Sequence, residues 1–209
     1  MDAVPDYRAE ISRKVLHLAA AVTPFVYVFL TRDTMIRLLA PCLLLAVTIE
    51  LLRYASPGFQ VVFRRWVGFM VRDVEWNRIT GATYVMVGAL LSVWWFPKPV
   101  AIAAMLIQIV SDTAASLIGI RFGRTRFLGK SLAGSGAFFI TAVIILWLAL
   151  PDSKGVALAA ALVATLAEAL PALRLGRFEL NDNVTVPLLT GITIWLLRDG
   201  PAWASLAGP

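Results

Sequence analysis

The chain has very little of the chemistry that builds disulfide scaffolds or zinc sites. Its 209 residues include one cysteine, Cys42, and one histidine, His17, which are too few for either class of protein. Charge is also scarce: 15% of the residues are charged, against about 25% in a typical soluble domain. Apolar residues make up 59%, gathered in long runs, and the mean hydropathy is +0.79. The sequence therefore predicts a protein that crosses a membrane several times.

The net charge of +6 and the pI near 10 raise the question of nucleic-acid binding. No soluble segment of the sequence carries a basic stripe interleaved with aromatic residues, which is the usual footprint of that function. In membrane proteins, basic residues instead mark cytoplasmic loops. We therefore expect no nucleic-acid partner.

Seven apolar runs approach or reach the length of a membrane-spanning helix, about 17–25 residues. They are 15–31, 35–52, 80–97, 99–120, 132–150, 154–170 and 184–198. The first run is longer than a signal-peptide core and lacks a clear cleavage site, so we expect it to be retained. No linker or repeat divides the sequence. The expected fold is all-α: a polytopic membrane helix bundle forming one integral-membrane domain, residues 1–209.

Basic residues are distributed unequally between the two sides that these spans define. Fourteen of the 19 lysines and arginines fall at the N-terminus or in the loops after the second, fourth and sixth spans. Because cytoplasmic loops are enriched in Lys and Arg, we expect a cytoplasmic N-terminus and a C-terminus on the outer side. An even number of spans would destroy this separation.

Residues 59–72 have a different pattern. Apolar residues recur there at helical spacing, and Gln60, Arg64, Gly68 and Arg72 fall on the opposite side. This pattern predicts an amphipathic helix on the cytoplasmic membrane surface. A connector packed on the bundle is an equally good interpretation.

Ionisable groups inside membrane spans are costly and are candidates for function by default. Here they are Glu50, Asp112 and Glu168, with the polar Gln108 nearby. All three acids fall in the half of their helix that is expected to be cytoplasmic. Glu168 could act as a general base or pair with an arginine. We therefore expect the chemistry to take place at the cytoplasmic face.

The richest stretch for chemistry runs from residue 111 to residue 135. On a helix, Asp112, Ser116, Gly119 and Gly123 share one face, and three arginines and a lysine follow within residues 121–130. Small-residue helix packing is one interpretation of this face. A carboxylate for Mg²⁺, together with cations and backbone N–H groups for phosphate, favours a nucleotide site.

The third, fifth and seventh spans all begin on the cytoplasmic side, and each begins with a polar signature: Thr80 to Thr83, Lys130-Ser131 and Asn181 to Asn183. Helix N-termini suit phosphate, although ordinary capping also explains such residues. Asp182 is more than a cap if it reaches the same metal as Asp112. Pro187 is expected in the first turn of the last span.

Taken together, these motifs resemble those of the CTP-dependent lipid kinases, which include dolichol kinase, phytol kinase and the CTP-using diacylglycerol kinase. The stretch from Ser111 to Gly123 is similar to S/G-D-x-x-A-x-x-x-G-x-x-F-G, and the stretch from Lys130 to Ser135 to K-S/T-x-x-G-S. Residues 10–17 resemble the E-x-x-R-K-x-x-H start of the family, 80–84 its T-G-A-T-Y segment and 181–187 its D-N-x-T-x-P segment. The resemblance covers most of the chain in the right order.

CDP-diacylglycerol synthases share the middle motif but carry a further acidic, glycine-rich signature near the C-terminus that contains histidine. This sequence lacks it, since its only histidine is His17, which favours the kinase branch. Two departures stand out: Ala133 replaces a glutamate that many relatives carry, and Gly129 replaces a second lysine. Glu50 or Glu168 would have to serve in place of that glutamate.

The resemblance implies a kinase that phosphorylates a membrane lipid alcohol (a polyprenol, dolichol, a phytol-like isoprenoid or diacylglycerol) with CTP and Mg²⁺. Asp112 and Asp182 are the candidate metal ligands, and Glu168 or Asp182 takes the proton from a hydroxyl that enters beneath helix 59–72. The candidate CTP-binding residues are Arg13, Lys14, Thr80, Gly119, Arg121, Gly123, Arg124, Lys130, Ser131, Gly134, Ser135 and Asn183. The alternatives are a cytidylyltransferase that makes a CDP-lipid and a non-catalytic membrane transporter or subunit.

Overall fold

The computed structural model describes residues 17–68, 71, 76, 78–171, 173–175 and 178–199, and this part of the chain is mostly helical. Its helices are α2 (Val22–Phe29), α3 (Arg32–Ala55), α4 (Pro57–Val67), α5 (Gly81–Trp95), α6 (Lys98–Leu106), the π-helical turn η3 (Ile107–Ser111), α7 (Asp112–Phe122), α8 (Leu132–Ala149), α9 (Lys154–Ala169), α10 (Asp182–Ile194) and the π-helical turn η4 (Trp195–Asp199). Two short antiparallel pairs join β1 (Arg126–Phe127) to β2 (Lys130–Ser131) and β3 (Leu173–Leu175) to β4 (Phe178–Leu180).

Three helices in the described part are long and apolar enough to cross a membrane: Arg32–Ala55, Lys98–Phe122 and Leu132–Ala149. The predictions of spans 99–120 and 132–150 agree closely with the last two. His17–Phe29 and Gly81–Trp95 are apolar but shorter, and α9 has 16 residues, or about 24 Å of helix, less than the ~30 Å of a hydrocarbon core. The all-α membrane fold is thus supported, while the count of seven spans is not confirmed.

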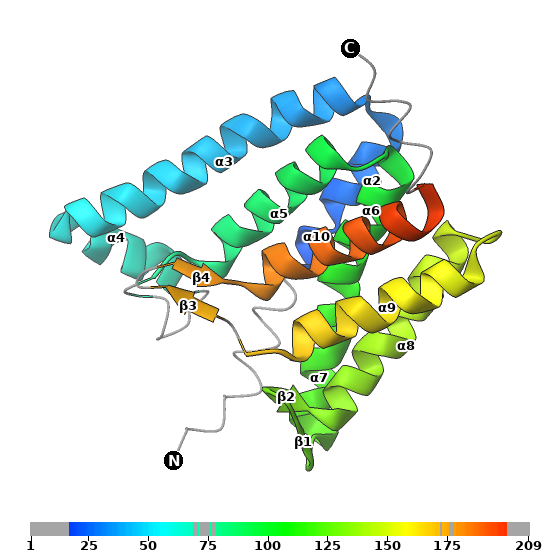
Figure 1. Cartoon of the computed structure of the whole chain (residues 1–209). Helices are drawn as coiled ribbons and strands as arrows, with labels where there is room; N and C mark the ends of the chain where they lie inside the picture. Colours follow the sequence, from blue (N-terminus) through cyan, green and yellow to red (C-terminus); the bar gives the residue numbers. More distant parts are fainter. Residues whose placement is uncertain are drawn as a thin grey trace.

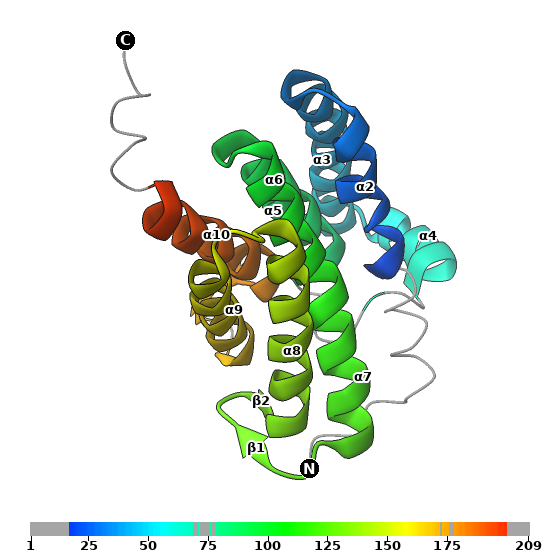
Figure 2. The same ribbon diagram turned by 90° about the vertical axis from the view of Figure 1, so that its right-hand side faces the viewer.

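Helices α7 to α10 pack in chain order, since α8 contacts both α7 and α9 and α9 contacts α10 (Figure 1). The contacts of α10 with α5 and of α5 with α3 then join helices that are not consecutive in the chain. Figure 2 shows α7 and α8 side by side, with α9 and α10 on one side of them and α2, α3 and α4 on the other. Small side chains make this close packing possible. In α9, Ala157, Ala160, Ala161 and Ala164 are fully buried, which lets neighbouring helix backbones approach closely.

Both strand pairs lie at the same end of the bundle, because β1–β2 joins the end of α7 to the start of α8 and β3–β4 joins the end of α9 to the start of α10 (Figure 1). The loops at 96–97 and 150–153 lie at the opposite end. The end that bears the strand pairs is the one for which the sequence predicts the chemistry.

The amphipathic segment predicted over 59–72 forms α4. Ser56 caps it by accepting a hydrogen bond from the Phe59 N–H (3.2 Å), and Pro57 occupies its first turn. Phe59 and Phe63 stack on each other, with centroids 6.4 Å apart. By contrast, Val61, Val62 and Trp66 are exposed, so α4 does present an apolar strip outward. Residues 69, 70 and 72 lie outside the described part of the chain.

The placement of Pro187 differs from the prediction. α10 begins at Asp182, so Pro187 is the sixth residue of the helix and lies beyond its first turn. Proline has no N–H to donate to the carbonyl four residues earlier, which here is that of Asn183. This carbonyl lies against Gly88 of α5, where any side chain would collide with it. The predicted position of Pro187 in the first turn is therefore wrong. The proline lies at the contact between α10 and α5.

Candidate functional site

Lys130 is at the centre of a cluster of charged residues at the end of the bundle that bears the two strand pairs, which we call the hairpin end. Its Nζ donates to Glu168 Oε1 at 3.0 Å and to Asp182 Oδ2 at 3.2 Å. The lysine comes from β2, Glu168 from the last turn of α9 and Asp182 from the first residue of α10. Lys130 is thus in direct contact with two other candidate site residues, which lie 38 and 52 positions away from it in sequence.

The turn between β1 and β2 holds Lys130 in this position. Leu128 adopts a left-handed conformation (φ 52°), which is uncommon for a residue with a side chain. The N–H of Gly129 donates to the carbonyl of Ala169 at 2.9 Å, and this bond fastens the turn to the end of α9. Gly129, which departs from the family pattern, therefore has a positioning role, and the next residue is delivered beside Glu168.

The electrostatics of the cluster favour a charged lysine. Burial alone would lower the pKa of Lys130, but the negative charges of Asp182, Glu168 and Asp112 outweigh it, so this pKa lies above its ordinary value. Asp112 is therefore close enough to act on Lys130 electrostatically. A permanently charged ammonium between carboxylates is a suitable contact for phosphate.

Asp112 faces the interior of the protein and not the surrounding hydrocarbon. It is 8% exposed, and its Oδ2 lies 3.4 Å from Nε2 of His17. The residue follows directly on η3, a π-helical turn that interrupts the long helix Lys98–Phe122. Such turns are frequent at functional sites. The predicted role of Asp112 as a metal ligand stays a prediction.

Four buried oxygens near this region have no hydrogen-bond partner among the described residues. They are Gln108 Oε1, Ser111 Oγ, Ser135 Oγ and Glu168 Oε2. Because buried polar atoms are almost always paired in folded proteins, these four indicate that water or a ligand completes the site. Glu168 is the clearest case, since Lys130 takes one of its oxygens and leaves the other free.

The carboxylates are suited to Mg²⁺, with one restriction. In the described part of the chain, no three His, Cys, Asp or Glu residues come close enough together to hold a metal ion. Mg²⁺ is commonly held by one or two carboxylates together with substrate phosphates, so the two predicted ligands, Asp112 and Asp182, have the right chemistry for an ion that arrives with a nucleotide. They do not fit a site built from protein ligands alone.

The glycine face of α7 is used for packing. A Cβ on Gly119 would lie 2.8 Å from Ser131 Oγ, and a Cβ on Gly123 would lie 2.6 Å from the same atom. Ser131 Oγ itself accepts a hydrogen bond from the Gly134 N–H at 3.1 Å and caps α8. The packing interpretation therefore accounts for Gly119 and Gly123, and capping accounts for Ser131. Their roles in binding CTP stay predictions.

Of the other cations predicted to bind CTP, two lie in the described part of the chain and two do not. Arg121 and Arg124 are exposed at the end of α7 and in the loop after it, and the guanidinium of Arg121 lies 5.5 Å from the centre of the Phe122 ring. Their position at the hairpin end leaves them accessible to a soluble anion. Arg13 and Lys14 lie outside the described residues.

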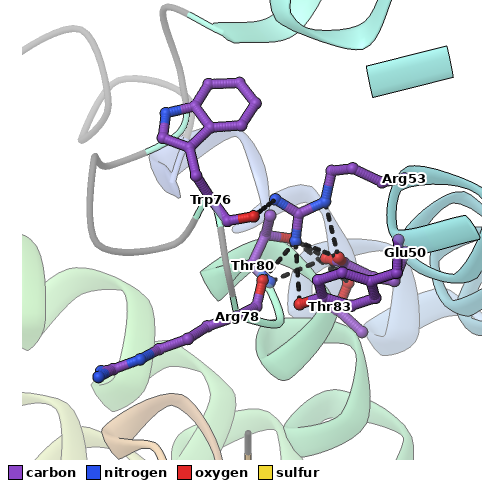
Figure 3. A network of polar contacts seen from close by, with 7 residues as sticks. Glu50, Arg53, Trp76, Arg78, Thr80 and Thr83 are labelled. Atoms are coloured by element: carbon purple, nitrogen blue, oxygen red, sulfur yellow. Dashed lines mark hydrogen bonds and ion pairs between the residues drawn. The ribbon is translucent and has the colours of Figure 1, made fainter. Parts of the chain in front are cut away.

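Thr80 belongs to a different cluster (Figure 3). Its N–H and hydroxyl donate to Glu50 Oε1 at 2.8 and 2.6 Å, and the Thr83 hydroxyl donates to the same oxygen at 3.2 Å. The other carboxylate oxygen of Glu50 binds the buried guanidinium of Arg53, which also donates to the backbone carbonyls of Trp76 and Arg78. This network ties the start of α5 to the end of α3. Both oxygens of Glu50 are occupied, so Glu168 is the better replacement for the missing family glutamate.

One contact was not predicted from the sequence. Gln108 Nε2 donates to Asn183 Oδ1 at 2.6 Å, which joins the long helix to the start of α10. Gln108 was noted only as a polar residue among the intramembrane acids, and Asn183 only as part of the last polar signature. A side-chain amide inside an apolar run has few hydrogen-bond partners available. The side-chain amide of Asn183 supplies one, because its oxygen accepts the hydrogen bond that Gln108 donates.

Comparison with curated proteins finds relatives over most of the chain. A protein of Rickettsia prowazekii described only as uncharacterized is 29% identical over 191 residues, which make up 88% of this chain and 92% of that protein. The CTP-dependent diacylglycerol kinase 1 of Saccharomyces cerevisiae is 30% identical over 143 residues, 66% of this chain and 49% of the yeast protein. The Schizosaccharomyces pombe protein of the same name is 26% identical over 170 residues, covering 73% of this chain and 76% of its own length.

The chain thus spans about half the length of the S. cerevisiae kinase that it matches. No protein-family model and no solved structure matches it. The resemblance drawn from the motifs is confirmed by these relatives.

Proposed function

The chain is a sequence relative of the CTP-dependent lipid kinases, and on this premise we propose that it transfers the γ-phosphate of CTP to the hydroxyl of a membrane lipid alcohol. The observation that carries the proposal is the contact of Lys130 with both Glu168 and Asp182, which joins the K-S and D-N motifs to the last turn of α9. Phosphoryl transfer depends on positioning and charge neutralisation more than on covalent catalysis, and a cluster of this composition supplies both. The protein acts as a single integral-membrane domain.

In this proposal, the phosphates of CTP contact Lys130 and the exposed cations Arg121 and Arg124. Asp112 and Asp182 are the ligands proposed for Mg²⁺, which when bound neutralises charge on the phosphates. The oxygen atom of the lipid hydroxyl attacks the γ-phosphorus, the bond between that phosphorus and the bridging oxygen breaks, and CDP leaves. Glu168 takes the hydroxyl proton through Oε2, the carboxylate oxygen that Lys130 does not contact.

The acceptor is proposed as a lipid alcohol in the cytoplasmic leaflet. The printed names of the fungal relatives make diacylglycerol the first acceptor to test. Polyprenol, dolichol and phytol-like alcohols, which the motif resemblance implies, form the comparison set. The cytoplasmic face rests on the distribution of basic residues.

The test uses purified protein in mixed micelles with Mg²⁺, one lipid alcohol at a time, and CTP labelled on either the α- or the γ-phosphate. We expect γ-label, and no α-label, in the lipid product. Transfer of α-label to a lipid phosphate added in parallel would instead identify a cytidylyltransferase. Absence of label from every lipid would contradict an enzymatic function of this class.

A further inference from the structure

A small apolar recess lies between α2, α5, α10 and the π-helical turn η3, beside the charged cluster. Its outer rim is formed by the partly exposed residues Ala20, Thr23, Val85 and Met86. The rest of its lining includes the buried residues Ala89, Met105 and Ile109 and the amide pair of Gln108, which is buried, and Asn183, which is partly exposed. We refer to it as the amide recess. It holds about 10 Å³, about the space that one water molecule or one hydroxyl group needs.

The side chain of Gln108 brings an unused hydrogen-bond acceptor to the amide recess. Gln108 is 3% exposed, and its Nε2 is taken by Asn183 Oδ1 at 2.6 Å. Its Oε1 has no partner among the residues that the structure describes. A buried amide oxygen left unpaired is destabilising, so this acceptor calls for a donor. The recess is too small for a nucleotide base, and its described lining residues include no cation for a phosphate.

The recess is also next to the candidate chemistry. Asn183 follows directly on Asp182, whose carboxylate binds Lys130. Gln108 precedes Asp112 by four residues, and its backbone carbonyl lies 3.4 Å from the same His17 Nε2 that contacts Asp112. A group bound at Gln108 therefore lies at the border between the apolar interior and the charged cluster.

We propose that the amide recess binds the hydroxyl group of the lipid alcohol before phosphoryl transfer, with Gln108 Oε1 accepting the hydroxyl hydrogen that Glu168 then removes in the transfer step, and with the chain of the lipid leaving past Ala20, Thr23 and Met86. This inference rests on the proposed function, since it assigns the acceptor subsite of that reaction. It differs from the entry route predicted beneath helix 59–72. The hollow beside α4, about 140 Å³ in volume, is lined by Gln60, Val61, Arg64 and Trp76 and by no residue of the charged cluster.

The test is a binding cycle without CTP, so that no turnover occurs. The ligands are 1,2-dioctanoylglycerol and its 3-deoxy analogue, which carries hydrogen in place of the hydroxyl group, or geranylgeraniol and its deoxy analogue if that alcohol is the one that accepts label from CTP. The proteins are wild type, Gln108→Met, which keeps the side-chain length and removes the amide, and Thr113→Val as the matched control. Thr113 is buried in the same long helix, and its hydroxyl donates to Ile109 within that helix at 2.7 Å.

We expect wild type and Thr113→Val to bind the alcohol about tenfold more tightly than the deoxy analogue, the value of one hydrogen bond. Gln108→Met is expected to bind both ligands with equal affinity and to keep the KM of the wild type for CTP. A tenfold preference that survives in Gln108→Met would overturn the assignment, as would equal weakening of the binding of both ligands. If wild type transfers no phosphate to any alcohol, the proposed function fails; if it transfers phosphate but the cycle shows no coupling, only the recess assignment fails.

Discussion

At the scale of single residues, Lys130 joins parts of the site that the sequence keeps far apart. Its ammonium contacts Glu168 and Asp182 and lies in the field of Asp112. The lysine could be predicted from its motif, because the K-S pair opens a helix. Its two partners could not, because the contact depends on how the β1–β2 turn docks on the end of α9.

Replacing this lysine tests its role in binding CTP. In Lys130→Met, the carboxylates of Glu168 and Asp182 lose their common cation and repel an incoming phosphate, so we expect the dissociation constant of CTP to rise by about tenfold or more. Equilibrium binding of labelled CTP to the purified protein measures it. The matched control is Lys154→Met, because Lys154 lies at the opposite end of the bundle with its Nζ 5.9 Å from the ring centre of Trp147. Equal CTP affinity in the two variants would contradict the assignment.

The pH dependence of the reaction gives a second test of Lys130. Since the pKa of Lys130 is raised, the stabilising effect of its charge is complete below the ordinary lysine pKa of about 10.4 and is lost only as the pH rises through the higher folded value. Between about pH 6 and about pH 9, titration of Lys130 therefore contributes nothing to kcat/KM for CTP. We expect Lys130→Arg to have the same alkaline limb as wild type. An alkaline limb that moves to higher pH in Lys130→Arg would show that the lysine loses its proton in this range.

Asp112 is the residue whose substitution tests the metal assignment. Asp112→Asn keeps the size of the side chain and removes its charge, so we expect turnover to be abolished while the folded protein is still extracted in detergent. Rates of γ-label transfer and size-exclusion profiles measure the two effects. Asp152→Asn, at an exposed position in the loop between α8 and α9, is the control and should keep full activity. Wild-type rates in Asp112→Asn would remove Asp112 from the metal site.

At the scale of helices and hairpins, the start of α10 depends on its contact with α5. Pro187 leaves the carbonyl of Asn183 without a helical donor, and that carbonyl rests against the bare Cα of Gly88. This contact fixes the position of the start of α10 along the axis of α5, and therefore the position of Asp182. A glycine in the middle of α5 is otherwise unfavourable for a helix, so the close approach explains why glycine is found there.

Gly88→Ala tests this contact. The added methyl group collides with the Asn183 carbonyl, so we expect a loss of about 1–3 kcal/mol of stability, as for other overpacked sites, together with reduced kcat/KM because Asp182 shifts. Thermal unfolding in detergent and γ-label transfer measure the two effects. Gly136→Ala in α8 is the control, since a Cβ there meets nothing within 4 Å, and it should raise stability by about 0.5–1 kcal/mol. If Gly88→Ala unfolds at or above the wild-type temperature, α5 and α10 are not in close contact at this point.

Helix boundaries were predicted well where the signal is local and poorly where it is not. The apolar runs at 99–120 and 132–150 correspond to Lys98–Phe122 and Leu132–Ala149, because uninterrupted hydropathy is a property of the run itself. Pro187 was misplaced because its role depends on Gly88, a residue of another helix. In sequence, Gly119 and Gly123 fit a packing face, but the charged residues around them favour a phosphate site. The position of Ser131 against both glycines shows that they are used for packing.

At the scale of the whole molecule, the sequence predicts which end of the bundle each site residue occupies, but it predicts only in part which of these residues meet. The alternation of helix directions was enough to place Lys130, Glu168 and Asp182 at the same end of the bundle. The alternation of helix directions could not show whether Glu50 or Glu168 replaces the missing family glutamate. Glu50 is bound by the guanidinium of Arg53, and this guanidinium is held in place by contacts with the segment before α5 that the sequence does not reveal. The seven-span count is not confirmed: α9 has 16 residues and α10 has 13, and both pack against neighbouring helices, where a helix need not match the thickness of a bilayer.

The orientation of the bundle is the prediction on which the cytoplasmic site depends, and it is accessible to direct labelling. In a Cys42→Ser background, Arg124→Cys places a thiol in the exposed loop between α7 and β1, and Asp152→Cys places one in the exposed loop between α8 and α9. Because the loops after the even-numbered spans carry most of the positive charge, a membrane-impermeant maleimide added to intact cells should label position 152 and leave position 124 unlabelled. Inside-out vesicles should give the reverse. Labelling of both positions from the same side would mean that α8 does not cross the membrane, and labelling of position 124 alone from outside would place the charged cluster on the opposite side from the cytoplasmic CTP it is proposed to use.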